Sequence, residues 1–152
     1  MACFQFGTRH RRKAFDGHES EVGEYALHIQ CSWRIARGDE ILVGRGDLFQ
    51  PESLASSTTD SYFDWQKSNL QDEKIRKLFM DDTRQFTVVA TALRAAGELD
   101  ILFDDELRLA VFPDSSVQTE GMEHWRLFVP SLTSDVNTKQ HLVFSGVGLR
   151  YE

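Results

Sequence analysis

The chain has 152 residues, a length that fits one domain and lets it bury roughly 70% of the surface that its unfolded form exposes. Hydrophobic residues make up 41% and charged residues 27%, which excludes the composition of a disordered protein. The formal net charge of −7 disfavours adhesion to polyanions, so nucleic acid is not expected as a partner. We therefore expect a single folded domain over residues 1–152.

We expect neither a membrane span nor a signal peptide in this sequence. No apolar run approaches the ~18 residues of a membrane span, and the N-terminus carries charges where a signal peptide needs an apolar core. Cys3 and Cys31 do not have the spacing of a metal or redox pair, which suits a reducing compartment. The sequence therefore predicts a cytoplasmic protein without a membrane partner.

Two segments near the N-terminus differ in charge. Phe4 and Phe6 alternate with smaller residues and predict a first strand. The basic run at 9–13 is followed at once by acidic residues at 16–24, which cancel its field. We interpret this run as a solvated loop between two strands rather than as an arm that contacts phosphates.

The clearest strand pattern lies at 25–35, YALHIQCSWRI. Large residues occupy every second position, namely Tyr25, Leu27, Ile29, Cys31, Trp33 and Ile35. Because successive side chains of a strand point to opposite faces, these residues share one face, which we expect to be buried. The pattern predicts one central strand over the whole segment.

A hairpin and a helix follow. The turn at 37–40 leads into an extended run at 41–43, and the Ser- and Thr-rich segment 50–61 is typical of a loop that could act as a flap. Ser68 and Gln71 fit a capping box, in which each side chain satisfies a backbone N–H at the start of a helix. Ile75, Leu78 and Phe79 then recur at helical spacing, so we expect a helix over about 69–81 that packs on the sheet.

The second half of the chain returns to the period of strands. Residues 86–93, 99–103 and 107–112 predict a three-stranded meander with turns at 95–97 and 104–106. Two more strands are expected at 123–129 and 141–146, where Gly146 and Gly148 loosen the second one. About eight strands and short connections predict an α+β, β-rich fold built on a curved, mostly antiparallel sheet or a partly open barrel, with the 69–81 helix against it.

Segments 23–35, 47–49, 112–114 and 124–128 together resemble a group of small uncharacterised bacterial proteins. The resemblance covers most of the chain and implies a bacterial source. No activity, cofactor or catalytic residue is known for that group, so none is carried over to this chain.

The candidate site consists of polar side chains on two predicted strands. His28, Gln30 and Arg34 share the second face of the strand at 25–35, and His124 and Arg126 lie opposite the apolar face of the strand at 123–129. If a strongly curled sheet brought these rows together, arginine forks and histidine would suit an anion or a carboxylate. The simpler alternative is a sheet with one wetted face and no site.

Catalytic motifs are absent from the sequence. There is no G-x-S-x-G elbow, H-E-x-x-H pair, glycine-rich phosphate loop or C-x-x-C pair, so no catalytic residue and no cofactor are predicted. Two sets of residues could in principle hold a metal ion: the histidines His18, His28, His124 and His141, and the acidic hairpin tip Asp100, Asp104, Asp105 and Glu106. The histidines lack ligand spacing and a charged turn explains the tip, so no metal site is predicted.

Two classes of function remain open. The leading hypothesis is a non-enzymatic binding or protein-interaction module of a bacterial cytosol, which holds a protein partner or forms a homodimer through a sheet face or an exposed strand edge. The alternative is a small enzyme, or a domain that binds an anion or a carboxylate on the polar sheet face.

Overall fold

The computed structural model describes the chain except for residues 14–17, 53–63, 65, 67, 80–84 and 131–140. Its contacts divide the chain into two compact units, one formed by residues 1–31 with 113–152 and the other by residues 32–112. Most of the predicted flap at 50–61 lies outside the described residues. The expectation of a single domain over 1–152 stays a prediction.

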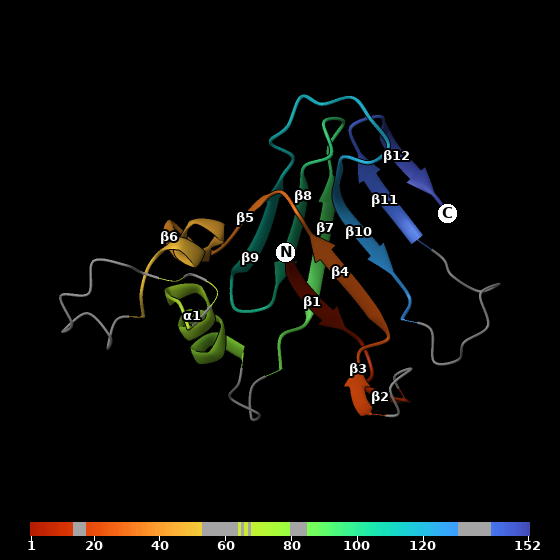
Figure 1. The fold of residues 1–152 in the computed structure, drawn as a ribbon. Coiled ribbons are helices and arrows are strands. Elements are labelled where there is room, and N and C mark those ends of the chain that lie inside the picture. The colour runs from red at the N-terminus through yellow and green to blue at the C-terminus, as the bar shows by residue number, and fades with distance from the viewer. Residues whose placement is uncertain (14–17, 53–63, 65, 67, 80–84, 131–140) are drawn as a thin grey trace. The chain divides into compact units, whose positions relative to one another are not determined.

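The first unit contains a five-stranded antiparallel sheet, named sheet I here, in the order β1-β4-β10-β11-β12 (Figure 1). Its strands are β1 (Ala2–Phe6), β4 (Tyr25–Ile29), β10 (Glu123–Phe128), β11 (His141–Ser145) and β12 (Gly148–Tyr151). Trp125 is 1% exposed and stacks on Phe144 of the neighbouring strand, with 5.9 Å between ring centroids. Aromatic cross-strand pairs of this kind stabilise one face of the sheet.

The basic segment is part of a hairpin in the same unit and not a loop. β2 (His10–Lys13) pairs with β3 (Glu19–Val22), which places Arg11 opposite Glu21. Opposite charges in cross-strand register attract each other, so the acidic residues do cancel the basic ones. The period-two signal was hidden because polar residues occupy both faces of these strands.

The second unit contains another five-stranded antiparallel sheet, named sheet II, in the order β6-β5-β9-β8-β7. Its strands are β5 (Ser32–Arg37), β6 (Glu40–Gly44), β7 (Val88–Leu93), β8 (Leu99–Phe103) and β9 (Leu107–Phe112). The predicted hairpin at 37–40 and the predicted meander at 86–112 are therefore confirmed. A 3₁₀ helix, η1 (Arg45–Phe49), and the helix α1 (Leu70–Phe79) complete this unit.

The prediction of one strand over 25–35 is wrong in one respect. The segment forms two strands, β4 in sheet I and β5 in sheet II, with a break at Gln30 and Cys31. The N–H groups of both residues donate to the carbonyl oxygen of His124, at 2.8 and 3.2 Å, so neither continues a regular ladder. The buried face is confirmed from Leu27 to Ile35, whereas Tyr25 at its start is 43% exposed.

The helix begins one residue later than its predicted cap implies. Asn69 caps it, because its Oδ1 accepts the N–H of Asp72 at 3.0 Å and its Nδ2 donates to the Asp72 carboxylate at 2.8 Å. Gln71 turns instead to η1, where its Nε2 donates to the carbonyl oxygen of Gly44 at 3.1 Å. The helix contacts η1 and β6, at the edge of sheet II.

The α+β, β-rich and antiparallel class is confirmed, but three open sheets replace the predicted single sheet or barrel. The described residues form twelve strands. The additional strands are β2, β3 and β12, together with the division of the segment 25–35. Gly148, with a φ of 104°, ends the turn that leads into β12, so a second hairpin replaces the single loosened strand.

Candidate functional site

Three of the five predicted site residues meet on one face of sheet I. Arg126 of β10 lies directly opposite His28 of β4, which puts both side chains on the same face. Gln30 follows β4, and its Nε2 donates to Glu123 Oε1 at 3.1 Å. We use the name polar cluster for the five residues on this face: His28, Gln30, Glu123, Arg126 and His141.

The guanidinium of Arg126 is already bound within the polar cluster. Its Nε and Nη2 donate to Glu123 Oε2 at 3.1 and 2.6 Å, and its Nη1 donates to His141 Nδ1 at 2.6 Å. Since a guanidinium has no acceptor, His141 carries no proton on Nδ1 in this contact. The charge and most donors of Arg126 are therefore used inside the protein.

The pKa values of this pair follow from the same contacts. Burial raises the pKa of Glu123, but the hydrogen bond and charge of Arg126, the Gln30 hydrogen bond and the His28 charge outweigh it, so the pKa lies below its ordinary value. The hydrogen bond to Glu123 raises the pKa of Arg126, against the effect of burial. Both groups are charged at neutral pH and neutralise each other.

The other two predicted residues lie elsewhere. Arg34 belongs to β5 in the second unit, where its guanidinium carbon is 5.2 Å from the centroid of the Phe112 ring, a cation–π contact. His124 is 3% exposed, with its ring 5.9 Å from that of Phe144, so it lies in the interior. The five-residue ligand site stays a prediction, of which the structure brings together His28, Gln30 and Arg126.

Glu123 and His141 were missed as members of the polar cluster. The alternation of the sequence places Glu123 on the apolar face with Trp125, but the pairing of β10 with β11 shifts register between these two residues. A bulge of this kind re-aims a side chain locally. Only the tertiary contacts of Glu123 reveal its position, because no bulge residue such as glycine marks this place.

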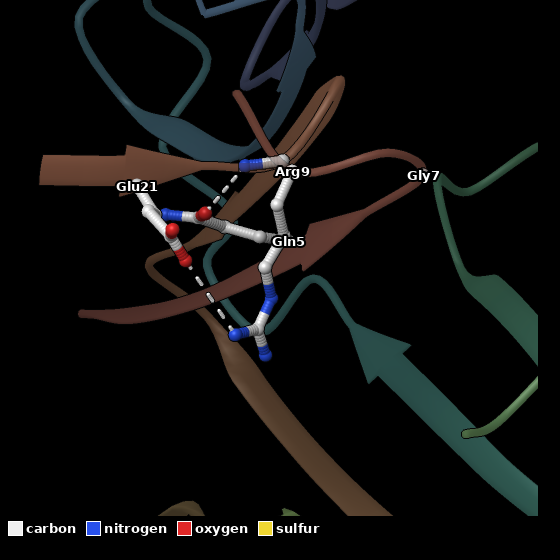
Figure 2. A pocket seen from close by; sticks show the side chains of 5 residues that line it. Gln5, Gly7, Arg9 and Glu21 are labelled. Atoms are coloured by element: carbon white, nitrogen blue, oxygen red, sulfur yellow. Dashed lines mark hydrogen bonds and ion pairs between the residues drawn. The ribbon is translucent and has the colours of Figure 1, made fainter. Parts of the chain in front are cut away.

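A hollow of about 280 Å³ lies beside β1 and is lined by Gln5, Gly7, Arg9, Glu21 and Gly23 (Figure 2). Gln5 Oε1 accepts the N–H of Gly23 at 2.7 Å, and Arg9 Nη1 is 3.8 Å from Glu21 Oε2. The side chains that Figure 2 shows are thus turned toward one another. This pairing leaves the hollow without a set of converging donors for a ligand.

Two acidic residues of the meander, Asp100 and Asp105, are paired with arginines. Asp100 accepts hydrogen bonds from Arg94 at 3.0 Å and from Arg108 at 2.9 and 2.6 Å, and Asp105 lies 3.0 Å from Arg37. Within the described residues, no group of three or more His, Cys, Asp or Glu side chains could hold a metal ion.

The most exposed part of sheet II is its last strand, β7 (green in Figure 1). All six residues of β7, VVATAL, are exposed, and Val89 is 58% and Leu93 45% accessible. The strand carries no charged side chain and pairs only with β8 among the described strands. We call the unpaired side of Val88–Leu93 the β7 edge.

The main-chain groups at the β7 edge follow from its register. The N–H of Arg94 donates to the carbonyl oxygen of Glu98 at 2.9 Å, so the main chain at 94 faces β8. Because N–H and C=O groups alternate sides along a strand, Ala92 also faces β8, whereas Thr91 and Leu93 face outward. These outward groups are the donors and acceptors with which a further strand would pair.

Two searches, one for a membrane-spanning helix among the described residues and one for similar proteins, found no match. Within the part of the chain that the structure describes, no helix is long and apolar enough to cross a membrane. No family model, no curated protein and no solved structure matches the chain.

Proposed function

We propose that this protein is a non-enzymatic interaction module that takes up an extended segment of a partner protein at the β7 edge. The observation that carries the proposal is a run of six exposed, uncharged residues in a strand at the end of an antiparallel sheet, of which residues 90–93 pair with β8 without interruption. Such an edge presents unpaired N–H and C=O groups that template the addition of another strand.

The other sheet edges are less suited to this role. Proteins blunt their edges with charges, bulges or covering elements. β6 carries Glu40 and contacts α1, and β12 carries Arg150, which is paired with Glu120 at 3.2 Å. β1 is uncharged, but every second residue in it is half-buried. β7 has a register shift between Val88 and Ala90, but it is exposed throughout and pairs regularly from Ala90 to Leu93.

Strand addition would draw affinity from two sources. The main chain at Thr91 and Leu93 would exchange hydrogen bonds with the incoming strand, and the apolar side chains would lose their contact with water. Hydrogen bonds of this kind carry no sequence information, so the side chains beside the strand would select the partner.

The proposal is tested with a short peptide of alternating valine and glutamine, N-methylated at alternate residues so that only one of its edges can pair. Binding is measured by fluorescence anisotropy against the full chain. We expect Thr91→Pro to abolish binding, because proline removes the outward N–H, while the strand keeps its bonds to β8.

Thr91→Val is the matched control, since it changes the side chain but keeps the N–H. It is expected to bind the peptide as the parent chain does. Circular dichroism of both variants checks that the fold is kept. Peptide binding that survives in folded Thr91→Pro would show that the β7 edge is not used.

The ligand site at His28, Gln30, Arg34, His124 and Arg126 remains the alternative hypothesis. Arg126 is bound by Glu123 and His141, and no observation on the described residues favours an anion there over the partners already present. The bacterial source and the cytosolic setting also stay predictions, and the latter is supported by Cys3 and Cys31, which form no disulfide.

A further inference from the structure

We infer that the partner segment is an amphipathic strand, apolar on one face and acidic on the other. The inference rests on the proposed function, because it describes the strand that the β7 edge would accept. It is carried by the side chains of β7 and β8, which differ between the two faces of sheet II.

On one face the apolar core continues onto β7. Thr91 lies opposite Ile101, and Leu93 lies opposite Leu99, which in turn lies opposite the fully buried Val111. Leu93 is nevertheless 45% exposed. An incoming strand would place its own side chains beside Thr91 and Leu93, where apolar residues would extend the row and remove it from water.

On the other face, small residues lead to a positive cluster. Ala92 lies opposite Asp100, whose carboxylate is shared by Arg94 and Arg108. Counted alone, Arg94, Arg108 and Asp100 carry one positive charge, and Glu98, which the register places opposite Arg94, lies beside them. The side chains of Arg94 and Arg108 are 58% and 47% exposed, so both can meet a further anion.

The geometry of the strand brings a partner carboxylate near these arginines. A partner residue opposite Ala92 would share its face, and Arg94 would be its diagonal neighbour two residues along β7. The methyl groups of Ala90 and Ala92 leave room above the strand for a long side chain. A glutamate there can therefore add a charge-assisted hydrogen bond to an exposed guanidinium.

A second copy of this chain would be a poorer occupant. β7 itself carries no acidic residue, so two β7 strands paired with each other would leave both positive clusters without an added partner. Charge complementarity thus favours a different protein segment, in which apolar and acidic residues alternate.

The test compares three N-methylated peptides in which valine alternates with glutamate, glutamine or lysine. At low salt the glutamate peptide should bind the full chain roughly three- to fivefold more tightly than the glutamine peptide, and the lysine peptide most weakly. The preference should shrink as salt is added, because exposed charges are screened.

Arg94→Gln is expected to remove most of the preference for glutamate while leaving the affinity for the glutamine peptide unchanged. Arg76→Gln, on the exposed side of α1, is the matched control and should keep the preference. We expect Arg94→Gln to fold, because Arg108 keeps its hydrogen bond to Asp100.

The outcomes separate the two proposals. Equal binding of the glutamate and glutamine peptides, lost in Thr91→Pro, would overturn the acidic partner but keep strand addition. A failure of all three peptides to bind would overturn both. A dimer in sedimentation experiments that Thr91→Pro abolishes would identify the second copy as the occupant and overturn the inference.

Discussion

At the scale of single residues, the described polar groups are largely satisfied by one another. The carboxylate of Asp47 accepts the N–H of Gly44 at 2.9 Å and lies 3.2 Å from Lys74 Nζ, which ties η1 to α1. Arg126 is held by Glu123 in the same way. The side chains of these two ion pairs are at most about a third exposed, so the pairs position the chain and have little capacity left for a ligand.

The turn between β8 and β9 carries backbone strain that one substitution can relieve. Asp105 and Glu106 have φ values of 62° and 57°, as at the central positions of a type I′ turn, where glycine is preferred at the second position. The left-handed conformation costs a non-glycine residue ~1–2 kcal/mol.

We expect Glu106→Gly to stabilise the protein by about 0.5–1 kcal/mol, after the entropic cost of glycine is subtracted. Urea denaturation measures the change in the free energy of unfolding. Gly38, with a φ of 55°, supplies the reverse control, because Gly38→Ala should destabilise although no atom lies near its added Cβ. A less stable Glu106→Gly variant would contradict the assignment of strain.

At the scale of elements, the cap of α1 is Asn69, one position after the predicted Ser68. Two polar residues, Ser68 and Asn69, precede the apolar stripe, and both types can cap a helix. Asn69 forms an isolated antiparallel β-bridge with Pro51 and is 2% exposed, whereas Ser68 is exposed. The tertiary pairing with the segment after η1 thus selected the cap, since local preference alone does not distinguish the two.

Asn69→Ala should therefore lower the free energy of unfolding by about 1 kcal/mol, since the N–H of Asp72 loses its acceptor. Ser68→Ala should change it by no more than a few tenths of a kcal/mol, as is usual at an exposed position. Thermal and urea denaturation of both variants measure the difference. The reverse order would restore Ser68 as the cap.

At the scale of the whole molecule, net charge and the β7 edge act together. A charge of −7 keeps copies of the chain apart at neutral pH, and this protection disappears near the sequence pI of about 5.2. An exposed, uncharged edge strand is then the expected starting point of self-association.

Val89→Lys is therefore expected to reduce light scattering near the pI more than Val147→Lys does. Val89 and Val147 are similarly exposed, at 58% and 52%, so the two changes add the same charge to comparable surfaces. Because Val147 lies in the turn between β11 and β12, only the first change places a lysine on the β7 edge. Equal protection by both variants would indicate an effect of net charge alone.

Alternation along the sequence is enough to predict most of the strands. Alternation of large and small residues predicted nearly every strand with an apolar face, and it identified the buried side chains of Leu27, Ile29, Trp33 and Ile35. This was possible because side-chain direction within a strand depends only on position along the chain. Strands with polar residues on both faces, such as β2 and β3, gave no such signal.

Which strands become neighbours could not be predicted from the sequence and is seen in the three-dimensional pairing. Hydrogen-bonded pairing joins residues far apart in sequence, so the alternation at 25–35 could not show that β4 and β5 enter different sheets. It also could not show that Arg126 meets Glu123 and His141, or that an apolar strand such as β7 would lie at a sheet end and remain exposed. Exposure depends on what lies next to a strand, which the residues of the strand do not encode.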